Sequence, residues 1–396
     1  MAADLLRSLQ DAQLVARFQR RCGLFPRDRP CPPADPPAHP PADPPAHPPA
    51  HPPAHPPAHP PADRDRRGSG PQVHAQKYIV KNYFYYYLFK FSAAMGQEIF
   101  YITFLPFTHW NIDPYVSRRL IVIWVVVMYI GQIAKDILKW PRPFSPPVVQ
   151  LEKRVIAEYG MPSTHTMAAT AISFTLLIST MNRYKYPFEV GVMAAVLFST
   201  LVSLSRLYTG MHTVLDVVCG ALITGLLIAV TYPAWNLIDH LHSANPLFPI
   251  LVLVVPFFLC YNYPASESYS PTRADTTTIL AAGAGGTLGF WINHFFKLAS
   301  EPTKYVLRGI PPITWGVLLL GLTKFTVGIV VVLLVRQLVR SLSLQVLYSW
   351  FRVATGNREA RRRLEIEVPY KFVTYTSVGL CATTFVPLLH RFLGLL

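Results

Sequence analysis

Three short motifs hold the residues of this chain that could do chemistry: KDILKWPRP at 135–143, PSTH at 162–165 and SRLYTGMHTVLD at 205–216. Hydrolysis of a phosphate ester needs cations to neutralise the phosphoryl group, a hydroxyl to bind its oxygens, a nucleophile, and an acid for the departing alcohol. The motifs supply all of these groups. The cations are Lys135, Arg142 and Arg206, and the hydroxyl belongs to Ser163. His212 is the candidate nucleophile, and His165 is the candidate acid.

His212 and Asp216 are four residues apart at the start of an apolar segment, so on a helix they share one face. Asp216 then accepts a hydrogen bond from one imidazole nitrogen and leaves the other free as the nucleophile. Taken singly, a histidine near a membrane interface is usually structural, and lysine or arginine snorkels towards head groups. The order and spacing of the three motifs together favour the functional interpretation.

The motifs resemble the tripartite signature of the type 2 phosphatidic acid phosphatase superfamily. In that signature a lysine before Arg-Pro, a Pro-Ser-Gly-His and a Ser-Arg followed by His and Asp occur in this order. Every charged position matches, whereas Thr164 stands where glycine is usual, and its β-branched side chain restricts the backbone there. Sphingoid-base phosphate phosphatases carry such a Pro-Ser-Thr-His. From residue 77 onwards, including EVPYKF at 367–372, the chain is similar to that sub-branch.

The resemblance implies hydrolysis of sphingosine 1-phosphate and related sphingoid-base phosphates, such as dihydrosphingosine 1-phosphate, in the endoplasmic reticulum membrane. It implies that His212 attacks phosphorus to give a phosphohistidine, that Asp216 orients it, and that His165 acts as acid and then as base. The phosphate-binding residues that it implies are Lys135, Arg142, Ser163, Thr164 and Arg206. Two alternatives stay open: a broad phosphatase for lysophosphatidic and phosphatidic acids, and a non-catalytic lipid-phosphate receptor or transporter.

The sequence predicts no cofactor and no metal. Three cations facing a phosphate dianion offset the cost of removing it from water, and the motifs contain no carboxylate-rich metal site. Five histidines occur in a proline-rich repeat, at positions 39, 47, 51, 55 and 59. Polyproline has about three residues per turn, so a four-residue repeat rotates successive imidazoles around the axis and does not favour a metal site.

The predicted fold is all-α: a polytopic transmembrane helix bundle with a disordered N-terminal segment. Apolar residues make up 51% of the chain and charged residues 14%, against about 25% charged in soluble domains. About nine apolar stretches approach the length that spans a bilayer. They are 84–107, 119–138, 166–181, 188–208, 212–233, 247–263, 276–299, 313–335 and 372–393. Because two of these lie between the second and third motifs, all three motifs face the same side of the membrane.

Two regions are predicted, an N-terminal region at 1–76 and a transmembrane phosphatase domain at 77–396. Residues 1–21 have apolar side chains near helical spacing, which indicates an amphipathic helix on the membrane surface or a frayed helix. Residues 32–63 repeat Pro-Pro-Ala followed by His or Asp, a composition that favours an extended, disordered tether.

The formal net charge of +15 does not indicate nucleic-acid binding, because the basic residues lie at the ends of apolar stretches and in short loops. The predicted partners are the lipid substrate and membrane lipids. Four arginines at 358 and 361–363 suit either an orientation signal or anionic head groups. The positive-inside tendency favours a cytoplasmic site, whereas the resemblance implies a lumenal one, and both sides stay open.

Overall fold

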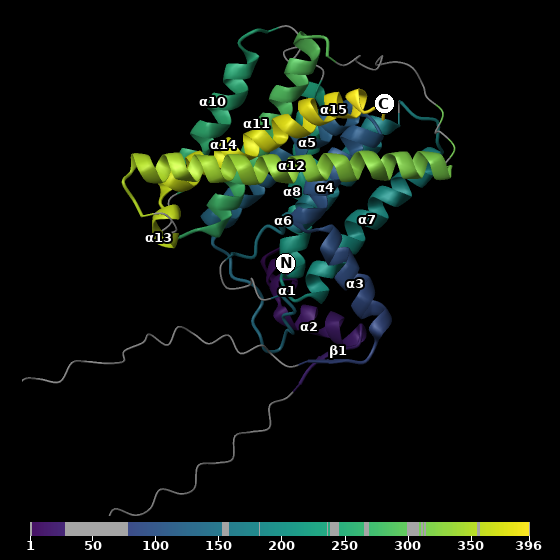
Figure 1. Cartoon of the computed structure of the whole chain (residues 1–396). Helices are drawn as coiled ribbons and strands as arrows, with labels where there is room; N and C mark the ends of the chain where they lie inside the picture. The colour runs from purple at the N-terminus through teal and green to yellow at the C-terminus, as the bar shows by residue number, and fades with distance from the viewer. Residues whose placement is uncertain are drawn as a thin grey trace, which may run out of the picture.

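A computed structural model of the chain describes residues 2–27, 78–152, 158–181, 183–235, 245–264, 269–298, 314–354 and 357–395, and the single positions 237, 309 and 312. The described part is mostly helical, as predicted, and its helices pack into one bundle (Figure 1). The repeat at 32–63 with its five histidines lies outside the described residues.

Within the described residues after the N-terminal region, the bundle contains ten helices of ten or more residues and several shorter elements. The long helices are α3 (Tyr83–Met95), α4 (Glu98–Asn111), α5 (Pro114–Leu138), α6 (Thr164–Thr180), α7 (Phe188–Tyr208), α8 (Val214–Thr231), α10 (Phe248–Tyr261), α11 (Pro271–Phe295), α12 (Trp315–Trp350) and α14 (Leu364–Leu380), of which α10 is the short apolar one. The short elements are η2 (Tyr232–Ala234), α13 (Arg358–Arg361), the π-helical η3 (Cys381–Phe385) and α15 (Val386–Phe392).

Among the described residues, five helical segments are long and apolar enough to cross a membrane, which supports a multi-pass membrane protein. They are Pro114–Leu138, Phe188–Tyr208, Val214–Ala234, Trp315–Trp350 and Leu364–Phe392. The apolar helix α10 has 14 residues and is shorter than a full span. The count of nine spans therefore stays a prediction.

The first expected span, 84–107, is two helices. Gly96 ends α3 and Gln97 precedes α4. A Cβ on Gly96 would lie 2.8 Å from Val202 Cγ1 and 3.3 Å from His165 Cδ2, so only glycine lets the backbone approach α6 and α7 this closely. The break thus lies directly beside a predicted catalytic residue.

Helix α6 occupies the centre of the bundle. Twelve of its 17 residues are buried, and most of them are alanine, serine or threonine. Small side chains on all faces let α5, α7 and α8 pack closely around it. One hydrophobic core forms where Tyr101 of α4, Leu120 and Trp124 of α5 and Ile172 of α6 meet. The second motif is therefore held at the end of the most enclosed helix.

The N-terminal region forms two helices, α1 (Ala2–Gln10) and α2 (Ala12–Arg21), and a strand, β1 (Leu24–Pro26). Asp11 separates the helices because its side chain caps α2. Strand β1 pairs antiparallel with β2 (Tyr78–Val80), a small sheet that the all-helical prediction did not include. These elements gather at one end of the bundle (Figure 1).

Helix α2 packs on protein, which differs from the surface helix expected at 1–21. Val15 and Ala16 are buried against Val148 and Leu207. The buried Gln19 donates hydrogen bonds to the carbonyls of Val149 and Tyr208, both at 2.8 Å, and accepts one from Val149 N–H at 2.9 Å. The polar side chain thereby ties α2 to the loop after α5 and to the end of α7.

Candidate active site

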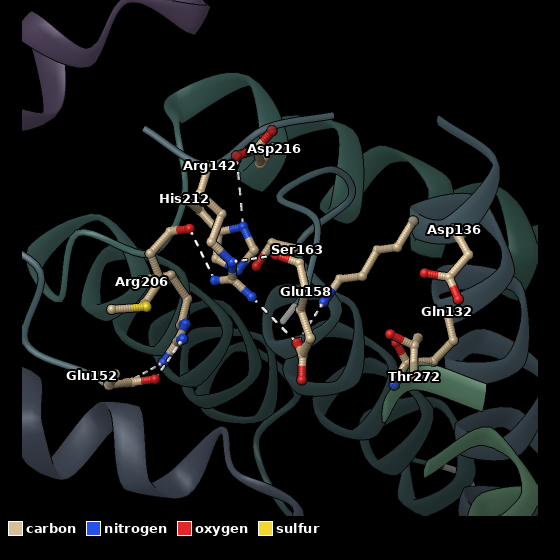
Figure 2. A network of polar contacts seen from close by, with 12 residues as sticks. Gln132, Asp136, Arg142, Glu152, Glu158, Ser163, Arg206, His212, Asp216 and Thr272 are labelled. Atoms are coloured by element: carbon tan, nitrogen blue, oxygen red, sulfur yellow. Dashed lines mark hydrogen bonds and ion pairs between the residues drawn. The ribbon is translucent and has the colours of Figure 1, made fainter. Parts of the chain in front are cut away.

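The three motifs meet at one end of the bundle, where α5 and α7 end and α6 and α8 begin (Figure 2). Lys135 is in the last turn of α5 and Arg206 in the last turn of α7. Ser163 is the N-cap of α6, and Asp216 is in the first turn of α8. Two helix N-termini and two cationic C-terminal turns therefore surround one small volume, a combination that favours an anion.

A capping box at the start of α8 sets the position of the third motif. Thr213 Oγ1 accepts from the Asp216 N–H at 3.3 Å, and Asp216 Oδ2 accepts from the Thr213 N–H at 2.8 Å. His212 precedes this cap and lies outside the helix, so the expected sharing of a helix face is wrong. The pair is nevertheless close, with His212 Nδ1 3.6 Å from Asp216 Oδ2, because the box turns the carboxylate back towards the preceding residues.

His212 is fully buried, and neither of its ring nitrogens has a hydrogen-bond partner among the described residues. Burial holds the pKa of this imidazole well below its ordinary value, and the charges of Arg142, Arg206 and Lys135 lower it further. The ring is therefore neutral at physiological pH. A neutral imidazole with a free nitrogen is the form that can attack phosphorus.

Ser163 joins the second motif to the third, because its N–H donates to the Asp216 carbonyl at 3.1 Å. Its hydroxyl oxygen is turned into α6, where it accepts from the Thr166 hydroxyl at 3.1 Å and the Thr166 N–H at 3.5 Å. Thr164 directs its methyl group at α5, since a Cβ on Gly131 would lie 3.2 Å from Thr164 Cγ2. A β-branched residue is thus accommodated here by the glycine opposite.

His165 is half-buried in the first turn of α6. It lies against Gly96 at the break between α3 and α4. The positive charges of Arg206, Lys135 and Arg142 act on its ring, and its charge in turn acts on His212. The two histidines therefore share one cationic environment.

Two carboxylates already bind the three cations. Glu158 Oε2 lies 3.5 Å from Lys135 Nζ and 3.3 Å from Arg142 Nη2 (Figure 2). Arg142 Nε also donates to the Glu158 carbonyl at 2.9 Å, and its Nη1 donates to the Met211 carbonyl at 3.1 Å. Glu152 binds Arg206 through both of its oxygens, at 2.8 and 3.1 Å.

The motif analysis missed both glutamates. A signal was present, because Glu152 and Glu158 are the two acidic residues of the segment 139–163, which joins the first motif to the second. Buried cations need counter-charges, and this segment was the nearest source of them. The three cations face three carboxylates, Asp216 and the two glutamates, so the formal charges cancel. A phosphoryl dianion that displaced the two glutamates would preserve this balance.

Residues 117–238 match the PAP2 superfamily, and this segment contains all three motifs. Human sphingosine-1-phosphate phosphatase 2 is 72% identical over 397 residues, which cover 99% of this chain and 100% of the relative. Rat sphingosine-1-phosphate phosphatase 1 is 38% identical over 318 residues, 80% of this chain and 74% of the relative.

More distant relatives include a dihydrosphingosine 1-phosphate phosphatase of Schizosaccharomyces pombe, which is 25% identical over 340 residues, 76% of this chain and 82% of the relative. No solved structure matches the chain. The similarity to the human and rat proteins extends over most of the chain, far beyond the matched segment. The chain belongs to the sphingosine-1-phosphate phosphatase family.

Proposed function

We propose that this protein is a membrane-bound phosphoric monoester hydrolase that converts sphingosine 1-phosphate, and related sphingoid-base phosphates, to the sphingoid base and inorganic phosphate. The observation that carries the chemistry is His212, a buried neutral imidazole beside a carboxylate and within the field of three cations. The names of the human, rat and fission-yeast relatives support the choice of lipid.

In the first step Lys135, Arg142 and Arg206 bind the phosphoryl oxygens and neutralise their charge. His212 attacks phosphorus in line with the lipid oxygen, so that a P–N bond forms while the P–O bond breaks. Burial and the charges of Arg206, Lys135 and Arg142 lower the pKa of His165 without substrate, and the bound phosphate dianion raises it again, so that His165 as its imidazolium gives a proton to the departing alkoxide. Asp216 stabilises the positive charge that develops on His212.

In the second step water attacks the phosphohistidine. His165, now neutral, accepts a proton from this water, the P–N bond breaks, and phosphate leaves. Both enzyme histidines return to their starting forms. The first turns of α6 and α8 add N–H groups that favour the charge on phosphate throughout.

The proposal places the enzyme in the endoplasmic reticulum membrane, with about nine spans and with membrane lipids around it. It keeps a division into an N-terminal region at 1–76 and a phosphatase domain at 77–396. Five spans of sufficient length and apolarity support a multi-pass protein. No metal or cofactor enters the proposed steps, because the cationic side chains supply the charge.

The test is phosphate release by the purified protein from a panel of sphingosine 1-phosphate, dihydrosphingosine 1-phosphate, lysophosphatidic acid and phosphatidic acid. Substrate labelled with radioactive phosphate should transfer the label to protein in an acid-labile, base-stable linkage. His212→Ala should abolish both release and labelling. A preference for the glycerol-based lipids would contradict the proposed substrate, and binding without turnover would indicate a receptor or transporter.

A further inference from the structure

An apolar cavity of about 410 Å³ lies between α4, α6 and α7, apart from the cationic site. Phe100 and Phe104 of α4 form one wall, Ile172 and Leu176 of α6 form another, and Phe198 of α7 completes it. Its volume falls in the range typical of small-molecule sites. The two steps of the proposed reaction leave this cavity without a role.

The cavity continues the face of α6 that carries His165. Ile172 and Leu176 follow His165 by seven and eleven residues, which at about 100° per residue places them within about 20° of it around the helix. Met95, next to Gly96, also lines the cavity, and Gly96 lies against His165. The cavity therefore begins beside the residue that protonates the departing lipid oxygen.

The cavity extends to the turn between α6 and α7, where Thr180 and Tyr186 line it and Thr180 Oγ1 lies 2.8 Å from Tyr186 Oη. Thr180 follows His165 by 15 residues, or about 22 Å of helix. An extended alkyl chain with C–C bonds of about 1.5 Å advances about 1.3 Å per carbon. The distance from His165 to Thr180 thus fits about 17 carbons.

We propose that this cavity, between α4, α6 and α7, holds the hydrocarbon chain of the sphingoid base and measures its length. The inference rests on the proposed function, which supplies a phosphate at one end of the chain. The hydrocarbon chain enters the cavity from the lipid bilayer and not from water. Packing contacts, rather than the exclusion of water, therefore decide which chain length is preferred. Chains near eighteen carbons fill the cavity, and longer chains meet the Thr180–Tyr186 contact.

Ala195 marks the middle of the cavity. Two contacts show how α7 is aligned with α6. The hydroxyls of Ser199 and Thr170 form a hydrogen bond of 2.7 Å, and a Cβ on Gly191 would lie 2.8 Å from Leu177 Cδ1. Helices α6 and α7 run antiparallel, and Ala195 lies halfway between these two contacts along α7. It is therefore level with about residue 173 of α6, which is roughly 12 Å along the helix from His165. A larger side chain at Ala195 would block the cavity at about the ninth carbon.

The experiment compares kcat/KM for sphingoid 1-phosphates of eight and eighteen carbons, presented at equal mole fraction in detergent micelles. Ala195→Phe should lower the ratio of the long-chain to the short-chain value by about tenfold. The control is Val196→Phe on the same helix, whose side chain is 47% exposed and outside the cavity. An unchanged ratio in Ala195→Phe, or the same fall in both variants, would overturn the inference.

Leu176→Ala tests the inference in the opposite direction, and keeps it testable if Ala195→Phe does not fold. It enlarges the cavity and should raise the rate for a twenty-carbon chain relative to eighteen carbons by about threefold or more. An unchanged or lowered ratio would contradict the inference. Thermal stabilisation by vanadate serves in each variant as the check of an intact phosphate site.

Failure of the inference is distinguishable from failure of the proposed function. If the wild-type protein hydrolyses no sphingoid 1-phosphate of any length, the proposed substrate is wrong. If it hydrolyses all of them and the variants keep the wild-type chain-length profile, the substrate stands and the cavity does not hold the chain.

Discussion

Arg206 and Glu152 form a two-point ion pair, with Nη1 2.8 Å from Oε1 and Nη2 3.1 Å from Oε2. The guanidinium is 1% exposed, so the pair supplies a charge that Arg206 would otherwise lack inside the protein. A phosphoryl group needs the same N–H donors. Substrate binding and this ion pair therefore compete for one cation.

Glu152→Gln removes the charge of this competitor. We expect a lower unfolding temperature without ligand, because Arg206 loses its counter-charge, and a larger stabilisation by vanadate than in the wild type. Thermal unfolding in detergent with and without vanadate measures both effects. Glu189→Gln, an exposed carboxylate at the other end of α7, is the control and should change neither. Weaker stabilisation by vanadate in Glu152→Gln would mean that the carboxylate positions Arg206 for phosphate.

Two substitutions separate the two roles of Asp216. Asp216→Asn keeps an oxygen for the Thr213 N–H but removes the charge that supports His212, so kcat should fall by about 10³-fold with little change in stability. Asp216→Ala should lose the same activity and also about 1 kcal/mol of stability, because the cap is gone. Turnover and thermal unfolding of both variants measure this. Equal stability losses would show that the capping box does not depend on the side-chain oxygen.

The acidic limb of the pH–rate profile should lie below the ordinary histidine pKa of 6.5. A lowered pKa means that His212 stays neutral as the pH falls, so the nucleophile is lost only at a more acidic pH. The measurement is kcat/KM against pH, with the ionisation of the substrate phosphate determined separately by phosphorus NMR and divided out. A limb that remains at or above 6.5 after this correction would contradict the lowered pKa of His212.

Chelators should leave the turnover of the purified protein unchanged, because Lys135, Arg142 and Arg206 carry the charge that a metal would otherwise supply. Vanadate should inhibit in the same assay, since it adopts a five-coordinate geometry like that of the transition state. Activity before and after treatment with EDTA, with magnesium restored as a control, is the comparison. Loss that magnesium reverses would place a metal in the reaction.

Deletion of residues 32–63 should leave turnover within about twofold, since the closure entropy of a flexible segment changes slowly with its length. The two strands that flank the region, β1 and β2, already pair with each other, so a shorter connection still joins them. Turnover and organelle distribution at matched expression test this. A tenfold loss of turnover would show that the proline–histidine repeat acts on the site.

The sequence was sufficient for the helical class and for the order of the motifs, because long apolar stretches and charged residues at their ends are local signals. It placed Lys135 and Arg206 at helix ends, where the structure also has them. It gave the wrong reason for the closeness of His212 and Asp216, because helix periodicity cannot show that α8 begins two residues after His212 and so leaves it outside the helix.

Contacts between distant segments were the part that the sequence could not supply. Glu152 and Arg206 are 54 residues apart, and no periodic pattern connects them. The strands β1 and β2 have three residues each, too few for an alternating pattern. The break at Gly96 has a local signal, since Gly96, Gln97 and Glu98 interrupt the apolar stretch, but the close approach of Val202 and His165 to this glycine is a contact between distant segments.

Gln19 lies almost a hundred residues before the segment that matches the superfamily, 117–238, yet it hydrogen-bonds to Val149 and Tyr208 within that segment. A protein trimmed to the matched boundaries would keep every catalytic side chain and lose this brace, leaving two carbonyls without their donor. The segment that matches the superfamily is thus shorter than the part of the chain that must fold together. For this family, the boundaries of an active enzyme therefore depend on the segments that contact the loops of the site, and these segments extend beyond the motifs.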